Sequence, residues 1–273
     1  MMMRILGALG LAGVSLSVAS PLVVAHRGAS AEAPENTLPA FELAWQQGAG
    51  AVEGDFRMTS DGVVVCIHDA DTQRVTGRKL VVKDSTWEQL QQLEIVGPVA
   101  PDDRPVGIPS ARQVFATVPV GKRVVVEIKC GPEIVPALMG DLEAAGLADD
   151  QVVVIAFDAE VVAAVKRAAP VITAHWLLRF ERNWLGRSKP SVKSVLATLK
   201  EIGADGCSAK SAGLKESIVR EVRQAGYQFH VWTEDDPARA QQLAEWGVQS
   251  ITTNVPATMV GALADGEAAR LDH

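Results

Sequence analysis

The sequence predicts an α/β protein, a TIM (β/α)8 barrel with a small insertion after the second barrel strand. Short apolar runs alternate with helix-like segments along the chain, and this alternation is typical of a parallel sheet with helical crossovers. No nucleotide-type glycine loop follows the first apolar run, which favours a closed barrel over the alternative, an open doubly wound sheet. With 273 residues, 48% of them hydrophobic, the chain is long enough for one such barrel.

The strands are predicted from short apolar runs of strand length. These runs are Leu22–Ala25, Ala51–Arg57, Val63–Ile67, Arg123–Lys129, Val152–Phe157, Val171–His175, Ala204–Ser208, Gln228–Trp232 and Ser250–Thr253. The helices are predicted from apolar residues at helical spacing, and several of these segments end at a glycine, the usual helix stop. They are Thr37–Gln47, Pro132–Ala145, Asp158–Ala169, Ser191–Ile202, Lys215–Ala225 and Pro237–Trp246.

The segment of residues 70–119 interrupts the alternation of strands and helices. It is rich in Asp, Pro and Gln, and its stretch 97-GPVAPDDRP-105 has the composition of a loop. We predict that this segment forms the insertion at the barrel mouth, with a short helix near Thr86–Leu93. It is too small to be a second domain.

The first 19 residues have the pattern of a secretory signal peptide. One arginine is their only charge, Ile5–Val18 is apolar or small, and Ser17-Val18-Ala19 fits a small-x-small cleavage site. A single barrel domain is then expected over residues 20–265, with a C-terminal tail at 266–273. We expect export to a periplasm or the cell exterior, with no stable membrane span once the signal is cleaved. A cytoplasmic or membrane-anchored protein is the alternative if the segment is not cleaved.

The charge of the chain argues against a nucleic-acid-binding surface, and the spacing of its cysteines argues against a cysteine-ligated metal site. The net charge is -7 and the chain has no Lys/Arg block, whereas a nucleic-acid surface needs a basic stripe; we expect no nucleic-acid partner. The three cysteines, Cys66, Cys130 and Cys207, show no metal-ligand spacing, and an odd number leaves at least one unpaired. We predict buried free thiols.

Three acidic residues fall where predicted strands end. Glu53 and Asp55 are two residues apart on one strand, so their side chains face the same side of the sheet, and Glu127 lies near the end of a later strand. Acids that converge inside a barrel repel one another and lose hydration, which a divalent cation among them would offset. All-oxygen ligands favour Mg²⁺ or Ca²⁺ over zinc. The alternative is salt bridging of Glu53 and Asp55, for example with Arg57.

Two histidines and two cations flank the same acids. His26 and His68 suit general acid and base work near neutral pH. Arg27 and Lys129 suit the neutralisation of a phosphate. The residues therefore predict metal-assisted phosphoryl transfer in which His26 and His68 exchange protons. No role is assigned to two further histidines, His175 and His230.

These motifs, in this order, resemble those of the glycerophosphodiester phosphodiesterases. The similarity extends from Leu22 to Met259. No single motif is decisive, but their order and spacing together are highly specific. The motifs are His26-Arg27-Gly28, 34-PENT-37, 53-EGD-55, 68-HD-69 with Arg74-Val75-Thr76, 127-EIK-129, 226-GYQFHVWTEDDP-237 and 247-GVQSITTNVP-256.

The resemblance implies an enzyme with a defined substrate and cofactor. Its expected substrates are small glycerophosphodiesters such as glycerophosphocholine or glycerophosphoethanolamine, hydrolysed to glycerol 3-phosphate and an alcohol through a cyclic phosphate, in lipid metabolism. Its expected cofactor is a divalent metal, Mg²⁺ or Ca²⁺. The resemblance implies metal ligands at Glu53, Asp55 and Glu127 and an acid/base pair at His26 and His68. It implies phosphate contacts at Arg27 and Lys129 and a glycerol-side aromatic at Trp232. Glu35 is expected to play a supporting role, either by orienting Arg27 or by assisting the metal.

The sequence departs from the family pattern at three places. Asn254 stands where the closing strand usually ends in aspartate, 232-WTED-235 where W-T-V-N is more common, and Ala156 where serine is common. We expect these departures to affect substrate contacts and not the chemistry.

Several alternatives stay open from the sequence. His68-Asp69 has a structural reading as a strand cap, and either Asn36 or Thr37 could cap the following helix. A phospholipase or lysophospholipase D-type enzyme that acts on lipid substrates is the rival enzyme. A non-catalytic barrel that binds phosphoryl ligands is the rival from another class.

Overall fold

The computed structural model describes residues 20–96, 105–182 and 188–271. The predicted signal segment at residues 1–19 lies outside these ranges. Within the three described ranges, no helix has the length and apolar character needed to cross a membrane.

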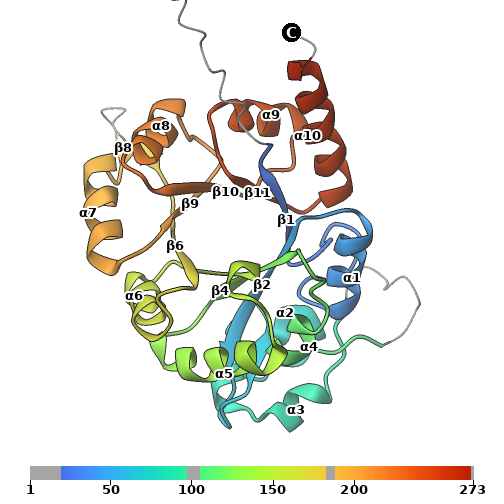
Figure 1. The fold of residues 1–273 in the computed structure, drawn as a ribbon. Coiled ribbons are helices and arrows are strands. Elements are labelled where there is room, and N and C mark those ends of the chain that lie inside the picture. Colours follow the sequence, from blue (N-terminus) through green and yellow to red (C-terminus); the bar gives the residue numbers. More distant parts are fainter. Residues whose placement is uncertain (1–19, 97–104, 183–187, 272–273) are drawn as a thin grey trace, which may run out of the picture.

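Eight parallel strands form a closed barrel, and helices lie around its outside (Figure 1). The barrel strands are β1 (Leu22–His26), β2 (Ala51–Met58), β4 (Arg123–Ile128), β5 (Val152–Ala156), β6 (Thr173–Leu178), β9 (Gly206–Lys210), β10 (Gln228–Trp232) and β11 (Ser250–Thr253). Strand β1 closes the barrel because it pairs with β11 on one side and with β2 on the other. The predicted TIM barrel is confirmed, and the open sheet is excluded.

The predicted helices are all present, with ends shifted by a few residues. They are α1 (Leu38–Gln46), α3 (Trp87–Gln91), α5 (Val135–Ala145), α6 (Ala159–Ala168), α7 (Val192–Ile202), α8 (Glu216–Gln224) and α9 (Pro237–Glu245). Thr37 is the N-cap of α1, since its side chain accepts from the backbone N–H of Ala40. Three helices were not predicted: α2 (Gln73–Thr76), α4 (Ala111–Phe115) and α10 (Pro256–Leu271). The predicted tail at 266–273 therefore begins inside α10.

The insertion begins before residue 70, the predicted bound, with a strand that is not part of the barrel. The chain turns back after β2, and β3 (Val64–Cys66) pairs antiparallel with it. The turn is held by Thr59, whose hydroxyl accepts from the Val63 N–H at 2.9 Å. The insertion has its own small core, in which Leu90 and Ile108 are buried. Because β3 runs antiparallel to β2, the chain that follows β3 returns to the barrel mouth.

The three cysteines are free thiols. Cys66 and Cys207 are buried, as predicted, and Cys130 is partly exposed. Burial raises the pKa of the Cys207 thiol to about 12. These groups are therefore protonated, inert parts of the structure at neutral pH.

The N-terminal end of the barrel interior holds buried polar side chains among the branched aliphatic ones that TIM barrels usually pack there. His175 and His230 stack there with ring centroids 4.1 Å apart. His175 Nε2 lies 2.9 Å from Gln228 Oε1, and His230 Nδ1 lies 2.7 Å from Ser250 Oγ. They border a cavity of about 310 Å³ at the end opposite the strand C-termini. Burial lowers the pKa of His175 to about 4 and lowers that of His230 as well.

We predict that this histidine pair makes the fold sensitive to acid. An unfolded histidine takes up a proton near pH 6.5, whereas folded His175 does so only near pH 4. The contribution of the pair to the free energy of unfolding should therefore be complete above pH 6.5. It should fall, for each of the two histidines, by up to about 1.4 kcal/mol per pH unit as the pH drops towards 4. Urea unfolding at pH 7.5 and 4.5 measures this loss. The variant His175→Gln should lose less stability over the same interval; an equal loss would contradict the prediction.

Candidate active site

Three buried carboxylates lie together at the C-terminal mouth of the barrel. Glu53 and Asp55 project from the same side of β2, and Asp55 is the register partner of Glu127 on β4. Each carboxylate offers one oxygen atom, and these oxygens all lie within 4.8 Å of one another. Burial, followed by repulsion from Asp55, raises the pKa values of Glu53 and Glu127. The cluster therefore needs positive charge to be stable in its ionised form.

The cluster has the chemistry of a divalent metal site. Glu53 Oε1 and Asp55 Oδ1 are buried and have no hydrogen-bond partner in the protein. Buried oxygens without a donor are costly, and carboxylate oxygens are the ligands that Mg²⁺ and Ca²⁺ prefer. The residues present thus fit a hard divalent cation held by Glu53, Asp55 and Glu127.

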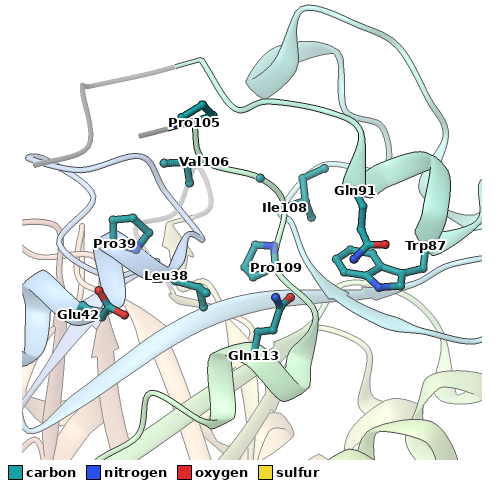
Figure 2. Close-up of a pocket in the computed structure, with 11 residues that line it drawn as sticks. Leu38, Pro39, Glu42, Trp87, Gln91, Pro105, Val106, Ile108, Pro109 and Gln113 are labelled. Carbon is teal, nitrogen blue, oxygen red and sulfur yellow. The ribbon is translucent and has the colours of Figure 1, made fainter. Parts of the chain in front are cut away.

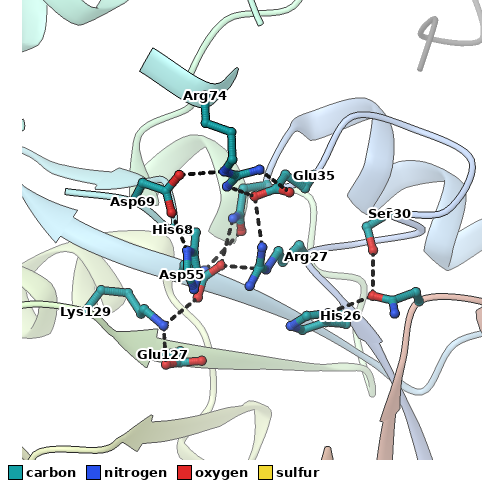
Figure 3. A network of polar contacts seen from close by, with 12 residues as sticks. His26, Arg27, Ser30, Glu35, Asp55, His68, Asp69, Arg74, Glu127 and Lys129 are labelled. Carbon is teal, nitrogen blue, oxygen red and sulfur yellow. Dashed lines mark hydrogen bonds and ion pairs between the residues drawn. The ribbon is translucent and has the colours of Figure 1, made fainter. Parts of the chain in front are cut away.

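Two cationic side chains border the acids (Figure 3). Arg27 Nε lies 3.0 Å from Asp55 Oδ2. Lys129 Nζ lies 2.7 Å from Glu127 Oε1 and 3.5 Å from Asp55 Oδ1. Arg57, the partner considered from sequence, instead donates from Nε to the backbone carbonyl of His68 at 2.9 Å. Arg27 and Lys129 are therefore the cations placed to meet a bound phosphate.

Asn36 orients Asp55 from the 34-PENT-37 turn and does not cap α1. Its Nδ2 donates to Asp55 Oδ2 at 2.8 Å, and its Oδ1 accepts from the Asp55 N–H at 3.0 Å. Asn36 has a φ of 58° and Arg27 a φ of 55°. Left-handed backbone is uncommon outside glycine and concentrates at functional sites. At Arg27 it aims the backbone N–H at Glu53 Oε2, 3.0 Å away.

His68 reaches the site from the antiparallel strand β3 and not from the end of a barrel strand. Its Nδ1 lies 2.7 Å from Asp69 Oδ1, and Asp69 Oδ2 lies 2.5 Å from Arg74 Nε. Arg74 binds both oxygens of Glu35, which also accepts from Arg27 NH1 at 3.0 Å. Figure 3 shows the resulting chain of polar contacts from His68 through Glu35 to Arg27. Asp69 therefore orients the imidazole and does not merely begin a turn.

His26 ends β1 beside Arg27, and its ring contacts Asn254, one of the departures from the family pattern. Its Nδ1 lies 2.7 Å from Oδ1 of Asn254. Burial, followed by the charge of Arg27, lowers the pKa of His26, so its ring is neutral at neutral pH. The expectation that Asn254 affects only substrate contacts is wrong, because this side chain touches a predicted proton-transfer residue.

An aromatic corner lies next to the acids. Trp232 Nε1 donates to the Ser208 carbonyl at 3.1 Å, and the ring of Trp232 meets that of Phe157 edge-on at 5.5 Å. The guanidinium of Arg179 lies 5.5 Å from the Phe157 ring centroid and 5.4 Å from that of Trp232. Lys129 Nζ lies 5.9 Å from the centroid of the same Phe157 ring. Trp232 and Lys129 were predicted from the sequence, whereas Phe157 and Arg179, which directly follow β5 and β6, were not.

The structure thus brings together all of the predicted acids, histidines and cations, and adds residues that sequence reasoning missed. Most of the missed residues bind a predicted one directly through a side-chain hydrogen bond. They are Asn36, Asp69, Arg74 and Asn254. Arg74 belongs to the motif Arg74-Val75-Thr76, which resembles the family pattern, and this resemblance was the signal that could have identified it as a site residue.

A separate hollow of about 400 Å³ lies between the insertion, α1 and α4 (Figure 2). Leu38, Trp87, Ile108 and Pro109 line it, together with one acid, Glu42. It contains none of the carboxylates, histidines or cations described above, so the chemistry of the site lies elsewhere.

Acids, histidines and cations converge at the mouth of this barrel, an arrangement that suits the class of hydrolases that cleave phosphodiesters. The model of the glycerophosphoryl diester phosphodiesterase family matches residues 26–258, and the chain belongs to this family. This finding confirms the resemblance drawn from the motifs.

Relatives and solved structures cover nearly the whole chain. A Mycobacterium tuberculosis protein named "Probable glycerophosphodiester phosphodiesterase 1" is 32% identical, over 91% of this chain and 94% of its own. A glycerophosphodiester phosphodiesterase of Caldanaerobacter subterraneus is 28% identical, over 90% and 98%. A solved phosphodiesterase of Oleispira antarctica, in complex with its product sn-glycerol-3-phosphate, shares the fold with a TM-score of 0.79 at 23% identity, over 90% and 97%.

We predict that Asn36→Ala weakens metal binding without unfolding the protein. The change removes both hydrogen bonds that hold Asp55, and loss of such supporting contacts typically costs about 10- to 100-fold in metal affinity. Calorimetric titration with Mg²⁺ and with Ca²⁺ measures the dissociation constants. The control is Gln91→Ala, which truncates an amide in the hollow of Figure 2 and should bind metal as the wild type does. Equal affinities of both variants would contradict the role given to Asn36.

Proposed function

We propose that this protein hydrolyses small glycerophosphodiesters to glycerol 3-phosphate and an alcohol, with the help of Mg²⁺ or Ca²⁺. The observation that carries the proposal is the convergence of three buried acids, two histidines and two cations at one barrel mouth. The product found in the Oleispira antarctica phosphodiesterase supports the substrate class.

The phosphodiester is held by charge. Arg27 and Lys129 would donate to the non-bridging phosphate oxygens, because their charged groups already lie within 3.5 Å of the acid cluster. A cation bound by Glu53, Asp55 and Glu127 would polarise the phosphate and neutralise charge that builds up on it. Glu35 keeps Arg27 in place through its hydrogen bond to NH1.

The two histidines move the protons. His26 is neutral, since burial lowers its pKa, and would take the proton from the glycerol hydroxyl that attacks phosphorus. His68, held by Asp69, would give a proton to the departing alcohol as its bond to phosphorus breaks. The product of this step is a cyclic glycerol phosphate. In the second step the roles reverse, so that water loses a proton to His68 and the reopened glycerol oxygen gains one from His26.

The aromatic corner supports a glycerol-sized group beside the phosphate. Trp232 is held by its bond to the Ser208 carbonyl, and Phe157 packs against it. The apolar ring faces suit the carbon skeleton of glycerol, whereas the nearby Arg179 suits its hydroxyl groups.

We predict that hydrolysis depends on a divalent cation. Release of choline from glycerophosphocholine, and of ethanolamine from its analogue, should fall at least about 100-fold after chelation, because the acids then lack the positive charge that aligns the phosphate. Adding back Mg²⁺ or Ca²⁺ is the control and should restore the rate. Equal rates with and without chelator would disprove the metal requirement. Faster turnover of lysophospholipid vesicles than of soluble diesters would support the lipase-like rival.

We predict that His26→Ala and His68→Ala each lower kcat about 100- to 10,000-fold, the usual size of a general acid or base contribution. Because the pKa of His26 is lowered from 6.5, the acid limb of the wild-type pH–rate profile should lie below pH 6.5. Circular dichroism of each variant checks that it is folded. Wild-type turnover in both variants would show that neither histidine transfers a proton.

A further inference from the structure

Asp235, in the loop after β10, is bound to the residue that holds His26. Its Oδ1 accepts from the Asn254 backbone N–H at 2.7 Å and from the Thr253 hydroxyl at 2.8 Å. Its Oδ2 accepts from Asn254 Nδ2 at 2.7 Å. Asn254 Oδ1 in turn lies 2.7 Å from His26 Nδ1. Asp235, Asn254 and His26 thus form one relay of hydrogen bonds across the ends of β10, β11 and β1.

The chemistry of a carboxylate determines how the Asn254 amide is turned. An ionised aspartate has acceptors only, so the NH₂ group of Asn254 must face Asp235. The amide oxygen then faces His26 Nδ1 and the Ser30 hydroxyl, which is 3.1 Å away. The Ser30 hydroxyl can donate or accept, so it fits either orientation of the amide. Asp235 is therefore the group in the relay that decides the orientation.

The orientation of the amide decides which nitrogen of His26 carries the proton. An amide oxygen only accepts, so His26 Nδ1 must be the N–H of the neutral ring. His26 Nε2 then carries the lone pair. A flipped amide would present its NH₂ group instead, Nδ1 would have to accept, and Nε2 would carry the hydrogen.

We propose that Asp235 is a positioning residue that, through Asn254, keeps His26 in the Nδ1–H tautomer and leaves Nε2 free to take a proton from the substrate hydroxyl. The inference rests on the proposed function and deepens it. It also gives a physical reason for two departures from the family pattern, W-T-E-D in place of W-T-V-N and Asn254 in place of aspartate. In this chain an acid stands at the place of the more common asparagine and an amide at the place of the usual aspartate, and the two side chains are in contact. The amide oxygen supplies the acceptor that His26 Nδ1 meets.

Three variants test the relay. In Asp235→Asn the new NH₂ group can donate to the oxygen of Asn254 and so favours the flipped amide. We expect kcat to fall at least about tenfold with KM within about threefold, since the base loses its lone pair while substrate contacts stay. Asn254→Asp alone places two carboxylates in contact and should also lower kcat. The exchange variant Asp235→Asn/Asn254→Asp restores an acceptor-only group at His26, and kcat should recover to within about threefold of the wild type.

The matched control is Asp236→Asn, the same chemical change one residue away. Asp236 caps α9 by accepting from the Ala238 N–H, and asparagine caps equally well. This variant should keep wild-type kcat and KM.

The tautomer itself is read by two-bond ¹H–¹⁵N correlation spectra of the histidine rings at pH 8, with the His26 signals assigned from their loss in His26→Gln. The wild type and the exchange variant should show Nδ1–H, and Asp235→Asn should show Nε2–H. An unchanged tautomer in Asp235→Asn, or no recovery in the exchange variant, would overturn the proposal. If wild-type protein cleaves no glycerophosphodiester, the proposed function fails, while the spectra still decide whether Asp235 controls the tautomer.

Discussion

Three carboxylates buried in one small volume impose the main constraint on this protein. Their ligand oxygens lie within 4.8 Å of one another, and two of their oxygens have no hydrogen-bond donor. Like charges at this distance and buried in the protein are unstable unless cations surround them. The positions of Arg27 and Lys129, and the fit of the three carboxylates to a divalent cation, follow from that requirement.

The backbone around the acids is shaped by the same constraint. Arg27 and Asn36 both adopt left-handed φ angles, and each uses this geometry to send a donor to one of the acids. The cost of such strain is offset by hydrogen bonds to charged groups, which are stronger than those between neutral groups. Glu35 then connects Arg27 to Arg74, so the insertion that supplies His68 is tied to the barrel by ion pairs.

The two histidines are held by different partners. A carboxylate, Asp69, lies at Nδ1 of His68, and an amide, Asn254, lies at Nδ1 of His26. An amide can present either end to its neighbour, and so it needs a second group to orient it, whereas a carboxylate does not. This difference explains why a loop residue as far along the chain as Asp235 matters to His26. At the opposite end of the barrel, His175 and His230 stack on each other and bond to Gln228 and Ser250, far from the mouth that holds the acids.

The sequence by itself determined the class of the fold and the acids, histidines and cations that meet at the site. Apolar runs of strand length predict the barrel because a parallel strand is buried on both faces, and period-two spacing places Glu53 and Asp55 on one side of β2. Tertiary structure decided the rest. Apolar composition does not reveal strand direction, so β3 looked like one more strand although it pairs antiparallel outside the barrel. The partners of His26, on the other hand, lie more than 200 residues along the chain. They meet it only because β1 closes the barrel against β11, and an exchange of acid and amide between Asp235 and Asn254 makes sense only once the two side chains are known to touch.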